Sequence, residues 1–163
     1  MRNNVWKQMA FGAAAGFAGT VVIQSLLMAH QKVSPQTMPP INRDPGEFML
    51  SKVKAALPAK AQERVPHKVE AVGAKLLGLG YGMTFGALYA VARPETKRSL
   101  LEGALLGLAA RAVGYLGWLP GAKLMRPVWK QNPAQVVLPV AEHALYGVAT
   151  VAGYCWLQER TES

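Results

Sequence analysis

The sequence predicts an all-α integral membrane protein, a four-helix bundle that forms a single transmembrane domain over residues 1–163. Three observations support this fold class: long apolar stretches that carry almost no charge, glycines gathered inside those stretches, and tryptophans gathered at their ends. A helix rises about 1.5 Å per residue, so roughly 20 apolar residues cross a hydrocarbon layer about 30 Å thick. Four stretches reach this length, and we expect each to cross the membrane once: residues 9–29, 71–92, 100–119 and 134–157.

The charges are distributed unevenly between these stretches and the rest of the chain. Of the 18 Lys/Arg and nine Asp/Glu, 23 lie in the 76 residues outside the stretches, and the 87 residues inside carry four: Lys75, Glu102, Arg111 and Glu142. The first stretch has no charge and is apolar on every side, whereas a helix of a water-soluble bundle keeps a polar stripe. It is also longer than the apolar part of a signal peptide, so we expect it to be retained.

Glycine and tryptophan are placed as in a membrane bundle. Fourteen of the 16 glycines lie inside the four stretches, where glycine lets helix backbones approach closely. All four tryptophans lie at or just outside the end of a stretch, where an amphipathic ring can sit at headgroup level: Trp6, Trp118, Trp129 and Trp156. We therefore expect helix packing contacts at Gly12, Gly16, Gly82, Gly86, Gly103 and Gly107.

Capping patterns predict the boundaries of the last two spans. Ser99 and Glu102 form a capping box at the start of the third span, which gives Glu102 a structural explanation. That span is expected to end at residue 119, before a Pro-Gly pair. Asn132 and Gln135 open the fourth span in the same way, with Pro133 at the first helical position. Pro139 lies inside this helix, where a missing backbone N–H is expected to produce a kink.

The first connection, residues 30–70, is long for a four-helix protein and contains six of the eleven prolines. Asp44, Pro45 and Glu47 resemble a helix start, and apolar residues then recur on one face: Met49, Leu50, Val53, Ala56 and Leu57. This pattern predicts a short amphipathic helix that lies on the membrane surface or caps the bundle. A surface helix packed on the protein's own loops is the alternative.

A weak internal repeat links the first half of the chain to the second. The first and third stretches share a G-x-x-x-G spacing, and the second and fourth share a Y-G-x6-Y spacing that begins at Tyr81 and Tyr146. Each half contains two crossings, so the repeat indicates two tandem helical hairpins related in parallel.

The predicted loops are basic on both sides of the bundle. The side of the chain ends and residues 93–99 carries six Lys/Arg, and the side of residues 30–70 and 120–132 carries ten, which favours a cytoplasmic location for the longer connections. Anionic lipid headgroups as partners explain much of the net charge of +9. The chain has no basic and aromatic module typical of nucleic-acid binding, so no nucleic acid is expected.

Arg111 is a charged residue inside a predicted membrane span, so we expect it to have a polar partner. It lies about mid-depth in the third span, where a charge costs at least ~2.5 kcal/mol on insertion scales. Glu142 in the fourth span lies at a matching depth, since both are about 12–13 Å from the same end at 1.5 Å per residue. We predict an Arg111–Glu142 ion pair beside His143, which serves either as an ion or proton relay or as a buried pair that fixes helix packing.

The three histidines, His30, His67 and His143, are brought to one side of the bundle by the alternating crossings. Facing histidines in four-helix bundles can hold haem or a metal. However, no H-x-x-x-H or E-x-x-H spacing supports such a site, so no cofactor is expected. Cys155 is the only cysteine and is expected to be a packing residue.

A resemblance adds to this interpretation. The first-span segment G-F-A-G-T-V-V, the polar proline-containing connection and the segment E-H-A-L-Y-G at residues 142–147 are similar to those of the YagU-like small bacterial inner-membrane proteins. The resemblance implies a multi-pass protein of four helices in the cell inner (plasma) membrane. That group is largely of unassigned function, so no catalytic residue is transferred.

Three functions remain open from the sequence. The first is an accessory or structural subunit of a larger membrane complex, with other membrane subunits or a homo-oligomer as partners. The alternative is a transporter or channel component that uses Arg111, Glu142 and His143. The third is a haem- or metal-binding membrane anchor. The sequence shows no catalytic constellation, so an enzyme is not expected.

Overall fold

The computed structural model describes residues 2–42, 44–58, 66–95 and 97–162. The described part of the chain is all-α, without a sheet, and its one isolated β-bridge joins Ile41 to Met125. Its helices are α1 (Arg2–Val33), α2 (Pro45–Ala55), α4 (His67–Ala92), α5 (Leu100–Arg111), α6 (Leu119–Gly121) and α7 (Pro133–Glu162). Three short turns of helix connect them: η1 (Pro35–Thr37), the π-helical η2 (Ala112–Trp118) and η3 (Val128–Lys130).

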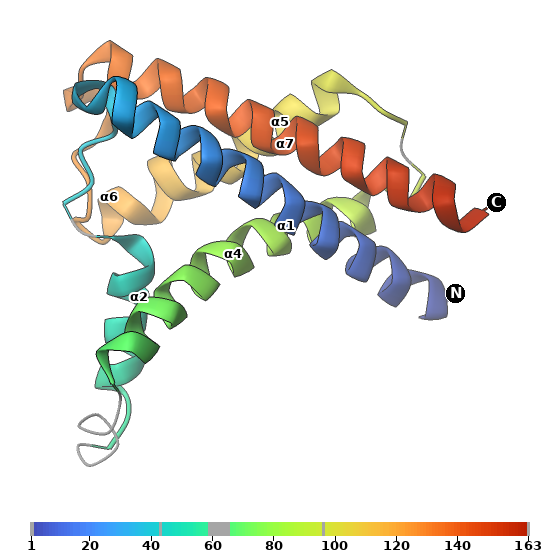
Figure 1. Ribbon diagram of the computed structural model, residues 1–163, viewed down its shortest axis with the longest axis horizontal. Coiled ribbons are helices and arrows are strands. Elements are labelled where there is room, and N and C mark those ends of the chain that lie inside the picture. Colours follow the sequence, from blue (N-terminus) through green and yellow to red (C-terminus); the bar gives the residue numbers. More distant parts are fainter. Residues whose placement is uncertain (1, 43, 59–65, 96, 163) are drawn as a thin grey trace.

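Helix α1 organises the bundle. It packs against both α4 and α7, and α5 packs along α7, whereas α4 and α5 touch at few points (Figure 1). The N-terminus and the C-terminus lie at the same end of the structure (Figure 1). Helix α2 leans against the first half of α4 at the opposite end.

Three helices of the described chain are long and apolar enough to cross a membrane: Val5–Val33, Leu100–Gly121 and Pro133–Thr161. They pack together and cover three of the four predicted stretches, which indicates a multi-pass membrane protein. The stretch 71–92 forms α4, which has 26 residues but is not among these three. Its 26 residues are long enough to span a membrane, and Lys75 is the one charged residue in the predicted stretch.

Hydrogen bonds at the helix starts confirm the predicted caps. In each cap a side-chain oxygen accepts a backbone N–H: Ser99 from Glu102 at 3.2 Å, Asp44 from Glu47 at 2.9 Å and Gln135 from Asn132 at 3.2 Å. The third span does not end at residue 119 as predicted, because α5 continues through η2 and α6 to Gly121. Pro120 lies in the first turn of α6, where a missing N–H removes no hydrogen bond.

Glycines lie where helices of the bundle approach each other closely. Gly12 and Gly16 of α1 lie against Gly82 and Gly86 of α4, and a Cβ added at any of them would overlap atoms of the facing helix. In the second half Gly103 and Gly107 of α5 lie in the same way against residues 143–148 of α7. The structure thus places all six predicted packing glycines at crossings.

Helix α2 has two different apolar faces. Its Gly46 lies on the backbone of Ala74, and Leu50 contacts Gly73, so this face packs on α4. Met49 and Val53 are 43% and 57% exposed on the other face. The predicted short helix is therefore confirmed. The apolar residues predicted to share one face are divided, because Leu50 is turned to α4 whereas Met49 and Val53 are exposed.

The end of the bundle opposite the chain termini is closed by loops. Tyr115, Leu119, Leu124 and Met125 form a buried cluster there, against which Phe48 of α2 and the side chains of Trp118, Ala122 and Val128 pack. The backbone N–H of Asn42 donates to the Leu124 carbonyl at 2.8 Å and ties the first connection to this cluster. The loops thus cover the polar residues described next.

Candidate functional site

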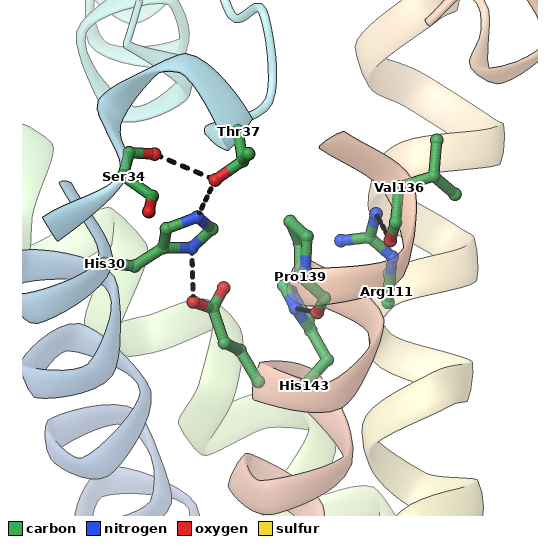
Figure 2. A network of polar contacts seen from close by, with 8 residues as sticks. His30, Ser34, Thr37, Arg111, Val136, Pro139 and His143 are labelled. Atoms are coloured by element: carbon green, nitrogen blue, oxygen red, sulfur yellow. Dashed lines mark hydrogen bonds and ion pairs between the residues drawn. The ribbon is translucent and has the colours of Figure 1, made fainter. Parts of the chain in front are cut away.

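A histidine and a glutamate meet where the last turn of α1 passes α7. Nδ1 of His30 lies 2.6 Å from Oε1 of Glu142, and both side chains are nearly buried, at 8% and 11% exposed. Nε2 of His30 lies 2.7 Å from the hydroxyl of Thr37 in η1, and that hydroxyl donates to the Ser34 carbonyl at 2.8 Å (Figure 2). The chain of contacts joins α1, η1 and α7.

His30 makes contacts through both of its ring nitrogens. Nδ1 faces the Glu142 carboxyl group and Nε2 faces the Thr37 hydroxyl, and the tautomer of His30 decides which nitrogen donates. A carboxylate only accepts hydrogen bonds, so an ionised Glu142 requires a proton on Nδ1. The contacts therefore hold the imidazole ring in a fixed orientation between α7 and η1.

Arg111 is buried in a different way. It is 6% exposed, its Nη2 donates to the Val136 carbonyl at 3.2 Å, and its guanidinium carbon lies 3.7 Å from the ring centre of Tyr115. Stacking on an aromatic face suits the planar, weakly hydrated guanidinium. The π-helical η2 begins directly after Arg111 and carries Tyr115, so the stacking partner comes from the same span.

Arg111 and Glu142 do not form the expected ion pair. Among the described residues no carboxylate oxygen lies within 4.0 Å of the guanidinium. Depth along a span does not fix the direction of a side chain around the helix. Val136 and Glu142 are six residues apart, which is about 120° around α7 at 3.6 residues per turn. Figure 2 shows His30 and Arg111 on opposite sides of Pro139.

His143 has a local partner. Its Nδ1 donates to the Pro139 carbonyl one turn earlier, at 2.8 Å, and its ring meets Tyr115 edge-on with centroids 6.3 Å apart. It lies on the Arg111 side of α7 and is not part of the His30 chain. The expected Arg-Glu-His cluster is thus divided into two groups: Glu142 with His30, and His143 with Tyr115 and Arg111.

Three buried polar side-chain atoms have no hydrogen-bond partner in the described structure: Nη1 of Arg111, Oε1 of Gln131 and Oε2 of Glu142. The atoms of Arg111 and Glu142 belong to the two groups described above.

The sequence contains no signal for the His30–Glu142 contact beyond the fact that both residues lie toward the same end. From the sequence, His30 is a candidate only for a metal or haem site.

A metal centre finds no support in the described part of the chain, where no group of three His, Cys, Asp or Glu side chains could hold a metal ion. His30 and His143 both engage other groups through Nδ1. The side chain of His67, the third candidate, lies outside the described residues.

A groove lies between α4 and α5 near the end that holds the chain termini. It has a volume of about 370 Å³ and is lined by Tyr89, Arg93, Glu102, Leu105, Leu106 and Ala109. The Glu102 carboxylate accepts from Arg93 at 2.6 Å and from the Tyr89 hydroxyl at 2.7 Å, so the capping residue also ties the two helices together. Tyr81 donates to the Ala110 carbonyl at 2.7 Å and makes a second contact between α4 and α5.

Comparisons with known protein families, with curated proteins and with solved structures find no match to this chain.

Proposed function

We propose that the protein crosses the membrane four times and serves as an accessory or structural subunit of a larger membrane complex. The packing of α4 along α1 supports α4 as the fourth crossing. At this contact Gly82 and Gly86 of α4 meet Gly12 and Gly16 of α1. A helix held this closely to a membrane span shares its depth. The equivalent glycine crossing between α5 and α7 supports the arrangement in two tandem hairpins.

The observation that carries the accessory role is the open side between α4 and α5. In the bundle, α1 packs on α4, α5 packs on α7, and α1 packs on α7, but α4 and α5 touch at only a few points. The groove there has apolar walls from Leu105, Leu106 and Ala109, and Leu105 is 56% exposed. A neighbouring transmembrane helix of a partner subunit would complete the bundle at this side, with its side chains in the groove.

Filling the groove is expected to release the partner. Ala109→Trp should lower the amount of partner that co-purifies in mild detergent at least about tenfold, which corresponds to about 1.4 kcal/mol. Leu101→Trp is the matched control, because Leu101 is on the same helix, 70% exposed, and does not line the groove. Quantitative mass spectrometry of the co-purified chains provides the measurement. A partner retained by the Ala109 variant, or lost equally from the control, would contradict the proposed docking side.

The alternative is a transporter or channel component. It is favoured by the unpartnered Arg111 Nη1 and Glu142 Oε2 and by the buried contact between His30 and Glu142. Proton flux in proteoliposomes that is lost in a folded Glu142→Gln variant would replace the accessory role with this one. The accessory role is preferred because the two polar groups lie on different sides of α7 and form no continuous path among the described residues.

The location in a bacterial inner membrane is also a proposal. It is supported by the three helices that can span a membrane and by the resemblance to the YagU-like proteins. Exposed basic residues in the loops suit anionic headgroups: Lys52, Lys123, Arg126 and Lys130.

A further inference from the structure

The outward side of α1 carries a regular seam. Helix α1 uses Gly12, Gly16 and Ile23 to pack inside the bundle, and the opposite side is exposed. The exposed residues on that side alternate in steps of three and four: Ala10, Ala14, Phe17, Val21, Gln24 and Met28. This is the spacing of the a and d positions in a coiled coil, whose side chains interlock with those of a facing helix.

One member of the seam is polar. Gln24 is exposed, and no hydrogen bond joins its amide to any described residue. The nearby Ser25 hydroxyl, by contrast, donates to the Val21 carbonyl at 2.9 Å. Gln24 lies within the apolar stretch 9–29, several residues from either end, so its amide would face hydrocarbon without water. An amide at such a position needs a partner from outside the chain.

We propose that this seam is the interface of a parallel, twofold-symmetric dimer in which the two copies of Gln24 bind each other. Copies of one chain inserted in the same orientation place equal residues at equal depth. Residues on the symmetry axis therefore face themselves. An amide group is both donor and acceptor, so two glutamines satisfy each other, as polar seam residues do when they set register in coiled coils. The small side chains at Ala10 and Ala14 let the helices approach.

The described chain leaves every seam residue exposed. The inference rests on the membrane location of α1 and not on the accessory role. A partner helix in the groove between α4 and α5 would leave this seam free, so the two interfaces are separate.

Disulfide cross-linking in native membranes tests the geometry. Gln24→Cys is expected to give a cross-linked dimer on mild oxidation, and Val22→Cys is the matched control. Val22 is 39% exposed at a similar depth but lies about 160° around α1 from position 24 at 3.6 residues per turn. Cys155 is buried, so the unchanged chain supplies the background. No cross-link at position 24, or equal cross-linking at position 22, would overturn the proposal.

The amide contribution is tested separately in detergent. Gln24→Leu should weaken dimerisation about three- to thirtyfold, as measured by the concentration dependence of the mass in analytical ultracentrifugation. Gln24→Asn keeps both hydrogen-bonding groups and should recover most of the affinity. Equal affinity of the Leu variant and the unchanged chain, or a monomer at every concentration of the unchanged chain, would contradict the paired amides.

Discussion

Replacement of His30 by leucine is expected to lower the free energy of unfolding by about 3–5 kcal/mol, because it leaves a buried acidic group without its partner. Glu142 is 9% exposed, and its Oε1 is bound by His30 at 2.6 Å. In the variant the Thr37 hydroxyl no longer has the imidazole of residue 30 as a partner, so this side-chain contact between η1 and α1 is lost. The midpoint of unfolding in detergent, followed by tryptophan fluorescence, provides the measurement.

A double variant separates the unpaired acid from lost packing. His30→Leu with Glu142→Leu removes both polar groups, and most of the lost stability should return, since apolar pairs can replace buried ionic ones. Arg98→Leu is the surface control. Arg98 and Glu159 form an ion pair at 2.7 Å but are 58% and 60% exposed, so their separation should cost less than about 1 kcal/mol. Additive losses in the double variant would show that His30 and Glu142 act independently.

Replacement of Gly107 by leucine is expected to separate α5 from α7 at a cost of about 3 kcal/mol or more. A Cβ at position 107 would overlap the backbone carbonyl of His143, and a helix backbone cannot move aside as a flexible side chain can. Glu142 lies on α7, so a displacement of α7 also disturbs the contact of Glu142 with His30 of α1. The crossing of α5 with α7 and the crossing of α1 with α7 are then both affected. The same unfolding assay measures the loss.

Gly78→Leu is the matched glycine control. A Cβ at Gly78 meets no atom within 4 Å, so a leucine there should change stability by less than about 1 kcal/mol. The comparison separates the close approach of two helices from the general effect of a glycine replacement. If both variants were equally stable, or equally destabilised, the crossing would not depend on Gly107.

The sequence predicted the parts of the fold that depend on local chemistry. The caps at Ser99 and Asp44 follow from side chains three residues from their N–H donors, so spacing was sufficient. The glycines at the helix crossings follow from the same reasoning, because a G-x-x-x-G spacing puts two small residues on one side of a helix.

The features that the sequence did not predict depend on the direction in which side chains point around a helix and on contacts between residues far apart in the chain. Depth along a span is a linear quantity, and it does not determine the direction in which Arg111 and Glu142 point around their helices. Their side chains point to different neighbours because α7 turns by about 120° between Val136 and Glu142. The contact between His30 and Glu142 joins residues 112 apart, and no local pattern encodes the way α1 crosses α7.

Four crossings by the chain are the central claim, and accessibility of single cysteines to a membrane-impermeant thiol reagent tests it most directly. Lys52→Cys, Glu95→Cys and Lys130→Cys place exposed thiols in the three connections. In sealed vesicles of one orientation, positions 52 and 130 should react from one side and position 95 from the other. Reaction of positions 52 and 95 from the same side would show that α4 does not cross the membrane and would contradict the four-span arrangement.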